Sequence, residues 1–314
     1  MYFCIPKILI KLNDNPVFNN MVKSQKTYQN LPYTEGYPQH YFIEIKSDFS
    51  IYYGYMTDLS DVSHRKTYIK SSKIFYDILN QDLSNTSHSE DNTLVFFHGW
   101  NGEYIPRLSG YVNSFDKHYV EDKTLNRTIS IIWHKGSLGY SGSRKKTIEF
   151  SEKLIDDFKI LTDFLNKNSE KQGMTYKNHL LCYSMGNYFF QHIFQQLDQN
   201  KKLFNQIILA APDLDCDIFE VGKGFENLSK IADKITILRH RKDRLLGTTK
   251  LMLRRNRLGR NGLSENTNLK GIQTIDVTGI GITVGLKDRI THHLYFYRNQ
   301  HAVDIIRQQL KGRN

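Results

Sequence analysis

From residue 94 onward, short apolar runs alternate with longer amphipathic stretches, and this alternation leaves few folds open to the chain. Each run is four to six residues long and apolar nearly throughout, which is typical of strands buried on both faces of a parallel sheet. The runs cover residues 94–97, 129–133, 180–183, 207–210, 235–238 and 272–277. The stretches 145–167, 186–197 and 299–310 have the period of amphipathic helices. The pattern predicts an α/β fold with a mostly parallel central sheet flanked by helices.

The first 90 residues differ from the rest, being rich in Tyr, Asn and Ser. Two alternating stretches within 41–56 predict a short hairpin. Residues 1–16 predict an N-terminal strand, with an atypical secretion signal as the alternative. The polar segment 80–92 predicts a loop. We therefore expect residues 1–90 to form a β-containing N-terminal extension that serves as a lid, a sheet extension or a partner surface, while residues 91–314 form the main domain.

Composition excludes several classes of protein. The chain has 314 residues, and 43 Lys and Arg against 32 Asp and Glu give a formal charge of +11. Charged residues make up 24%, a globular value that excludes wholesale disorder. No run approaches the roughly 18 to 20 apolar residues of a membrane-spanning helix. The odd set of Cys4, Cys182 and Cys216 fits a reducing compartment, so we expect a soluble, cytoplasmic protein.

A serine follows the apolar run 180–183 and precedes a helical pattern. Ser184 there has the setting of a nucleophile elbow, a strained turn from strand to helix that wants small residues two positions before and after the serine. Cys182 and Gly186 occupy these positions. The amino-terminal end of the following helix would stabilise an oxyanion beside the serine. The alternative is an ordinary helix-capping serine.

A His-Gly pair follows the run 94–97. Such a pair after an early strand often builds an oxyanion hole from backbone N–H groups. His98 and Gly99 would form the turn, and the N–H groups of Trp100 and Met185 are the candidate donors. The alternative is a plain glycine turn followed by a packing aromatic residue.

An acid and a histidine follow the later runs. Asp243 comes after 235–238, where it is placed to accept a hydrogen bond from an imidazole, although a surface aspartate among basic neighbours is the alternative. His293 comes after 272–277 and a glycine-containing loop, where it is placed to act as general base toward Ser184. The chain order Ser, Asp, His, each after a predicted strand, is that of α/β hydrolases. The sequence therefore predicts a Ser184–Asp243–His293 triad.

Six segments between residues 94 and 311, about two thirds of the chain, resemble a widespread bacterial α/β-hydrolase family of unassigned function. They are HGWNGE, SIIWHKGSLGYSGS, CYSMGNYFFQHIF, AAPDLDCDIF, KDRLL and HHLYF. The family itself is similar to esterases and lipases. The resemblance implies that Ser184 is the nucleophile, Asp243 the acid and His293 the base. The chain departs from the family pattern at Tyr183, where a histidine is usual, and at Cys182 and His134.

Two assignments stay open. Asp215 follows the run 207–210, and an acid from that position is a known variant, so Asp215 is the alternative acid. His292 is the neighbour of His293 and the alternative base, while His301 lies inside the last predicted helix.

Residues 239–262 are strongly basic. Arg254, Arg255 and Arg257 are candidates for binding an anionic membrane surface, and a solvated helix face is the alternative. We expect no nucleic acid as partner, because aromatic residues do not interleave with these arginines. We also expect no metal and no cofactor. The chain has no H-E-x-x-H or Cys/His cluster, and residues 278–284 lack the third glycine of a dinucleotide loop.

These observations predict a serine hydrolase that cleaves a carboxylic ester of a small molecule or lipid, with residues 91–314 as the catalytic domain. One alternative is a non-catalytic binding protein that keeps the fold. Another is a secreted toxic effector of the phospholipase type, which would share the chemistry and differ in location.

Overall fold

The computed structural model describes residues 39–57, 65–84, 90–102, 105–168, 175–264, 271–279 and 291–312. Its strands are β1 (His40–Ile45), β2 (Ile51–Thr57), β3 (Arg65–Ile69), β4 (Glu90–Phe97), β5 (Arg127–Trp133), β6 (Thr175–Tyr183), β7 (Phe204–Ala210), β8 (Ala232–Arg239) and β9 (Ile272–Asp276). Its helices are α3 (Ser72–Ser84), α4 (Ile105–Phe115), α5 (Tyr140–Asn168), α6 (Met185–Phe194), α7 (Arg244–Leu253), α8 (Leu258–Asn261), α10 (Tyr295–Arg298) and α11 (Gln300–Leu310). A π-helical turn, η1 (Asp116–Val120), follows α4, and a short 3₁₀ turn, η2 (Leu228–Lys230), precedes β8.

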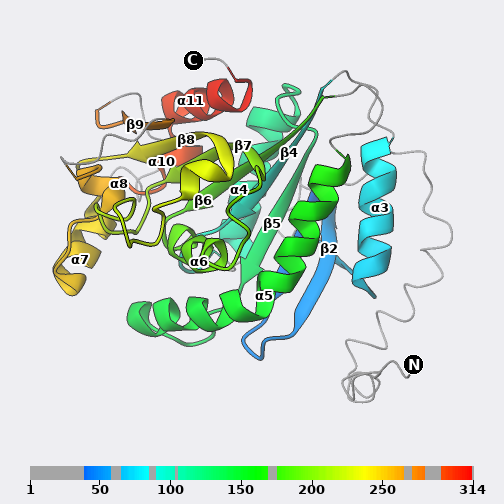
Figure 1. The fold of residues 1–314 in the computed structure, drawn as a ribbon, viewed down its shortest axis with the longest axis horizontal. Helices are drawn as coiled ribbons and strands as arrows, with labels where there is room; N and C mark the ends of the chain where they lie inside the picture. The colour runs from blue at the N-terminus through cyan, green and yellow to red at the C-terminus, as the bar shows by residue number, and fades with distance from the viewer. Residues whose placement is uncertain are drawn as a thin grey trace. The chain divides into compact units, whose positions relative to one another are not determined.

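One sheet forms the centre of this part of the chain (Figure 1). Its strand order is β3-β2-β1-β5-β4-β6-β7-β8-β9. From β1 to β9, neighbouring strands run parallel, and only the pairs β1–β2 and β2–β3 are antiparallel. The chain therefore has the α/β fold that its alternating pattern predicts, and the carboxyl ends of its parallel strands meet at one edge.

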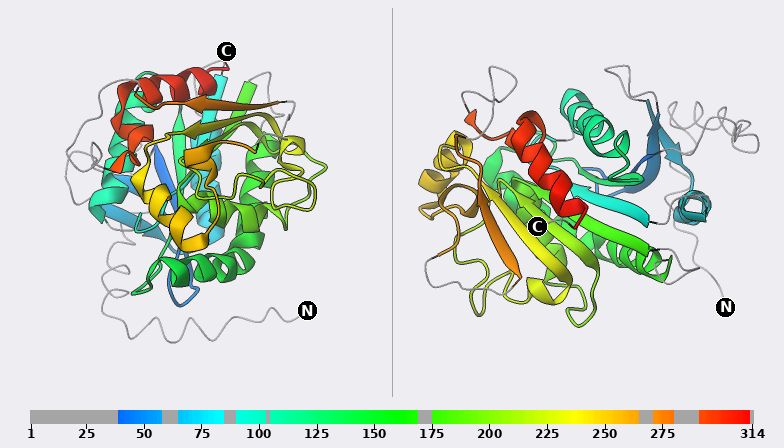
Figure 2. Two further views of the ribbon diagram at one scale, coloured as in Figure 1. Left: turned by 90° about the vertical axis from the view of Figure 1, so that its left-hand side faces the viewer. Right: turned by 90° about the horizontal axis from the view of Figure 1, so that it is seen from above.

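The apolar runs become buried strands because helices cover both faces of the sheet (Figure 2). In β4, Phe96 packs against Phe115 of α4, whereas the next residue, Phe97, packs against Phe158 of α5 and Phe189 of α6. Successive side chains of a strand point to opposite faces, so a doubly covered strand is apolar throughout. The six predicted strands are confirmed, but β9 lies at the edge of the sheet and is partly exposed.

The predicted hairpin is confirmed and belongs to the same sheet. β1 pairs antiparallel with β2, and its other side pairs parallel with β5, where Ile45 lies opposite Trp133. Residues 40–69 thus contribute strands to the sheet that contains β4–β9. The predicted strand or secretion signal at 1–16 lies outside the described residues, and the division of the chain at residue 90 stays a prediction.

The helix predictions hold in place but not always in length. α5 begins at Tyr140, five residues before the predicted start at 145, while α6 and α11 lie within two or three residues of their predicted bounds. The loop predicted over 80–92 was wrong at both ends, because α3 continues to Ser84 and β4 begins at Glu90. Among the described residues, no helix combines the length and the apolar character needed to cross a membrane.

Candidate active site

Ser184 lies on a strained turn between β6 and α6. Its φ of 53° and ψ of −123° fall in a backbone region that residues other than glycine rarely adopt. Backbone bonds fix the turn, since Ser184 N donates to Ala210 O at 3.0 Å and Asn187 N donates to Ser184 O at 3.1 Å. The Asn187 side-chain amide also donates to Cys182 O at 3.1 Å. This is the geometry of a nucleophile elbow, which presents the serine side chain at the carboxyl end of the sheet.

Two glycines let the chain pass close to this elbow. A Cβ at Gly186 would lie 2.5 Å from Phe97 O and 2.6 Å from His98 O, closer than real Cβ contacts. A Cβ at Gly99 would lie 2.9 Å from Ser184 Cβ. The end of β4 and the turn after β6 are therefore packed directly against each other, and the glycines at these positions make that approach sterically allowed.

His293 and Asp243 complete a line of hydrogen-bonding groups with the serine. His293 Nε2 lies 2.9 Å from Ser184 Oγ, and His293 Nδ1 lies 2.6 Å from Asp243 Oδ2. Both side chains are buried. With Nδ1–H donating to the carboxylate, Nε2 is left as the acceptor for the serine hydroxyl. The structure thus brings together the three residues of the predicted triad.

Asp243 is held from several sides. It caps the N-terminus of α7, where Oδ1 accepts a hydrogen bond from Leu246 N at 2.9 Å. Its backbone N donates to His240 O at 3.0 Å, and its carbonyl accepts from the Arg260 guanidinium. Because Oδ1 is occupied by a backbone group, Oδ2 stays directed at His293. The helix cap therefore fixes the acid, which in turn orients the imidazole.

His98 has a structural place in the turn after β4. Trp133 N donates to its Nε2 at 3.1 Å, so Nδ1 carries the proton and donates to Gly99 O at 2.7 Å. The ring stacks on Trp133 with 5.2 Å between centroids. Burial lowers the pKa of His98 to about 3, which keeps the imidazole neutral. His98 thus shapes the His-Gly turn.

The two candidate oxyanion donors flank the elbow. Met185 is the first residue of α6, so its N–H is among the amino-terminal groups that have no partner within the helix. Trp100 follows Gly99, and its indole Nε1 donates to Ser143 Oγ at 3.0 Å, which anchors the ring to α5.

The alternative acid, Asp215, lies in a different cluster. Its carboxylate pairs with Arg257, whose Nε also donates to Asp213 Oδ1 at 2.9 Å. Asp213 accepts further bonds from Thr249 Oγ1 at 3.2 Å and from the Tyr140 hydroxyl. The structure therefore shows Asp215 bound to a guanidinium, while Asp243 is the carboxylate that contacts His293.

This cluster corrects one part of the predicted membrane surface. Arg257 is 0% exposed, so it does not face a membrane, because two carboxylates hold it inside the protein. Arg254 and Arg255 are exposed. The run of basic residues in the sequence carried no sign of this difference, since the carboxylates that bury Arg257 lie more than 40 positions earlier in the chain.

The alternative base, His292, is adjacent in sequence and distinct in position. Its φ of 52° turns the chain at this point, and its ring stacks on His240 with 4.9 Å between centroids. His301 is exposed on α11. The sequence analysis did not predict that the Asn187 side-chain amide holds the elbow turn by donating to Cys182 O. Its place in the S-M-G-N segment was a signal for this role.

The comparison with protein families agrees with this geometry. Residues 74–313 match the model of a family described as an α/β hydrolase of unknown function (DUF900). The chain belongs to this family. The family match and the strand order together show that the chain has the α/β-hydrolase fold.

Solved structures that resemble this α/β hydrolase include several esterases and hydrolases. ESTFA in its Fe-lacking apo form has a TM-score of 0.38 at 11% identity, covering 95% of this chain and 91% of that one. A zinc-bound cold-adapted esterase from an Arctic intertidal metagenomic library has a TM-score of 0.35 at 14% identity, with 71% and 84% covered. A serine hydrolase homologue from Coxiella burnetii has a TM-score of 0.34 at 14% identity, with 71% and 84% covered. These scores are too low to carry an argument about activity.

No curated protein matches the chain. Among the described residues, no group of three or more His, Cys, Asp or Glu side chains is arranged to hold a metal ion.

Proposed function

We propose that this α/β hydrolase cleaves carboxylic esters, with Ser184 as nucleophile, His293 as general base and Asp243 as the acid that orients His293. The observation that carries the proposal is the hydrogen-bonded line from Asp243 through His293 to Ser184 Oγ. The serine in this line also has the backbone strain of a nucleophile elbow. Asp213 and Asp215 belong to another cluster and take no part in the chemistry.

In the first step, Ser184 Oγ attacks the ester carbonyl carbon while its proton passes to His293 Nε2. The bond from Nδ1–H to Asp243 Oδ2 stabilises the imidazolium that forms. The tetrahedral intermediate then collapses, the bond to the alcohol oxygen breaks, and the alcohol leaves with the proton from Nε2. The product of this half-reaction is an acyl ester of Ser184.

In the second step, water attacks the acyl carbon and gives a proton to His293 Nε2. Collapse of the second intermediate breaks the bond to Ser184 Oγ, which takes the proton back, and the carboxylic acid leaves. Both intermediates carry a negatively charged oxygen. We propose that the backbone N–H groups of Met185 and Trp100 donate hydrogen bonds to this oxygen. A donor of this kind contributes roughly 3 to 4 kcal/mol to the transition state.

An exposed aromatic side chain near the triad supports an ester with an apolar part. Trp100 follows Gly99, at which a Cβ would lie 2.9 Å from Ser184 Cβ, and Trp100 is 36% exposed. Tyr183, whose ring lies 5.2 Å from the His293 ring between centroids, is buried in the core. Aromatic side chains favour apolar acyl or alcohol groups over sugars.

The proposal is tested with a panel of p-nitrophenyl esters of increasing acyl length. We expect hydrolysis by the native protein and a loss of at least about 10³-fold in kcat for Ser184→Ala and for His293→Ala. Ser137→Ala, at an exposed serine beyond the end of β5, is the matched control and should leave the rate unchanged. Full activity in Ser184→Ala, or no hydrolysis by folded native protein, would contradict the proposal. The second result would favour a non-catalytic binding protein.

A further inference from the structure

Helix α7 carries large apolar side chains on its solvent face. Leu245 is 45% exposed, Leu251 is 78% exposed and Met252 is 54% exposed. On the inner face, Leu246 and Thr249 are buried. The helix therefore packs on the protein through Leu246 and Thr249, and it exposes Leu245 near its start and Leu251 and Met252 near its end to solvent.

The exposed charged residues that flank these apolar side chains in the sequence are all cations. Every exposed charged residue between positions 241 and 255 is basic, namely Arg241, Lys242, Arg244, Arg254 and Arg255, and the one carboxylate in this stretch, Asp243, is 0% exposed. Two of the five are partnered, Arg241 by Asp276 and Arg255 by Asp215. Within the described part of the chain, Lys242, Arg244 and Arg254 form no ion pair. We name this set of exposed residues, from Arg241 to Arg255, the α7 surface.

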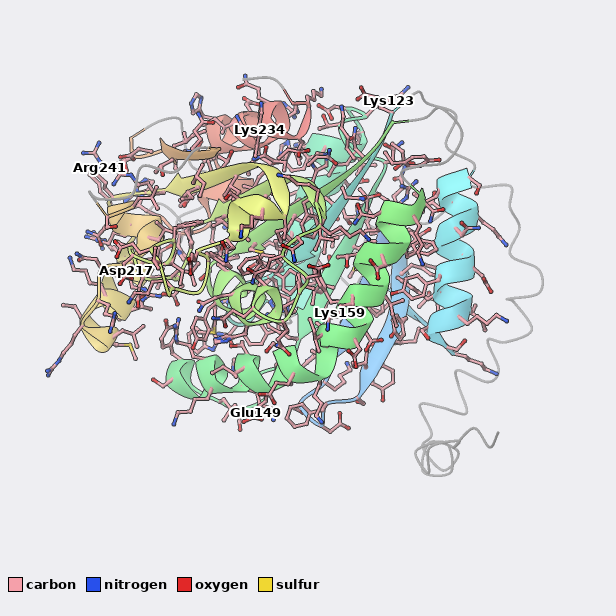
Figure 3. The ribbon with its side chains drawn as sticks, viewed as in Figure 1. Lys123, Glu149, Lys159, Asp217, Lys234 and Arg241 are labelled. Atoms are coloured by element: carbon pink, nitrogen blue, oxygen red, sulfur yellow. The ribbon has the colours of Figure 1, made fainter. Side chains whose placement is uncertain are left out.

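The longer helix α5 shows that this composition is not general for the protein. The solvent face of α5 also has an exposed apolar residue, Ile160, at 53%. Its exposed charges are of both signs, with Lys153 and Lys159 beside Glu152 and Asp156. Figure 3 labels Lys159 on α5 and Arg241 at the far side of the molecule next to α7. Mixed charges are typical of a solvated face, whereas cations that flank apolar residues are typical of helices that lie on anionic lipid.

The α7 surface begins at the candidate active site. Asp243, which contacts His293, is the N-cap of α7, and the helix follows directly from it. With a rise of about 1.5 Å per residue, Leu251 and Met252 lie roughly 12 to 14 Å further along the helix. Figure 1 shows α7 at the left edge of the molecule, and the left view of Figure 2 turns this side toward the viewer. A surface bound there would lie next to the triad.

We propose that the α7 surface docks on an anionic lipid bilayer, with Leu251 and Met252 entering the headgroup region and Arg244, Arg254 and Arg255 contacting lipid phosphates. Docking itself is independent of catalysis. Its consequence, that the ester cleaved is that of a lipid presented by the bilayer, rests on the function proposed above. Arg257 has no part in the surface, since it is buried between Asp213 and Asp215.

Docking is measured by co-sedimentation of the full chain with vesicles of phosphatidylcholine alone and of phosphatidylcholine with 30% phosphatidylglycerol. We expect binding to the anionic vesicles at low salt and weaker binding at high salt. Arg254→Glu/Arg255→Glu and Leu251→Ser/Met252→Ser should each weaken binding at least about 10-fold. Matched controls on α5, Lys153→Glu/Lys159→Glu and Ile160→Ser, should change it less than about 2-fold.

The outcomes separate docking from catalysis. If the four α7 substitutions leave binding to anionic vesicles unchanged, or if native protein binds neither kind of vesicle, docking is overturned. Equal binding to both kinds of vesicle would also overturn it, because the cations would then have no role. If the α7 variants lose self-association in size-exclusion chromatography instead, the surface is an interface between copies. Hydrolysis of a short soluble ester is measured in parallel and should be unchanged in all variants, so a failure of the proposed catalysis appears there alone.

Discussion

Two buried carboxylates follow neighbouring strands of the sheet, and their partners give them different properties. Asp213 follows β7 and Asp243 follows β8, and these strands pair in parallel. Asp213 is bound by the guanidinium groups of Arg257 and Arg144 and by two hydroxyl groups, so it forms a fixed ionic cluster. Asp243 is bound by a backbone N–H and an imidazole that itself contacts a serine hydroxyl. An aspartate at a strand end therefore becomes a candidate catalytic group only when its partner can still accept and release a proton.

Asp243→Asn tests the carboxylate of the pair that contacts His293. The amide presents an NH₂ group where the carboxylate accepted a hydrogen bond, so His293 is driven to the tautomer that cannot accept from Ser184. We expect kcat/KM to fall by about 10⁴-fold, or about 5.5 kcal/mol, with little change in far-UV circular dichroism. Asp215→Asn is the control and should lower kcat/KM by less than about 10-fold, since Asp215 is partly exposed and lies outside the triad. Equal losses in the two variants would show that the clusters are not distinct.

Arg257→Met tests how much the ionic cluster around Asp213 contributes to stability. Removing the guanidinium leaves the buried Asp213 carboxylate with only the longer ion pair to Arg144, at 3.6 Å, so we expect the free energy of unfolding in urea to fall by about 3 kcal/mol. The double variant Arg257→Met/Asp213→Asn should recover part of this loss, because the buried carboxylate charge is removed together with the guanidinium. Activity per folded molecule should stay within a few-fold of the native value. A large loss of activity without loss of stability would mean that Arg257 belongs to the active site.

The sequence predicted the triad because each of its residues directly follows an apolar run, and parallel strands bring their carboxyl ends together. It did not decide between Asp215 and Asp243, since both follow strands. The choice depends on Arg257, which pairs with Asp215 from 42 positions away. The same pairing explains why Arg257 was wrongly placed on the surface, because the sequence of this basic stretch does not show which cation is buried. Helix α3 was missed because its C-terminal residues are as polar as a loop.

Within the residues that the structure describes, His179 is a buried histidine without a carboxylate partner, in contrast to His293, which contacts Asp243. Its Nε2 lies 3.4 Å from Asn92 Oδ1, and in the described structure its Nδ1 has no hydrogen-bond partner. Burial, with a smaller contribution from the charge of Lys177, lowers the pKa of His179 to about 3. The unfolded chain, with a histidine pKa of about 6.5, binds the proton that the folded chain excludes. Stability should therefore fall as the pH drops from about 6.5 toward 3.

His179→Leu should remove this contribution, so its Tm should fall less steeply between pH 7 and pH 4 than that of the native protein. We expect this change in free energy to be smaller than those for Asp243→Asn and Arg257→Met. His301→Gln, at an exposed histidine of α11, should keep the native slope. If His179→Leu also keeps the native slope, burial does not hold His179 neutral.

The central claim, that Ser184 is an activated nucleophile, is tested most directly by a fluorophosphonate probe with mass-spectrometric mapping of the adduct. We predict one adduct on Ser184 that is absent in Ser184→Ala, strongly slowed in Asp243→Asn, and unchanged in Asp215→Asn. An adduct on another residue, or a folded native protein that forms none, would contradict the account.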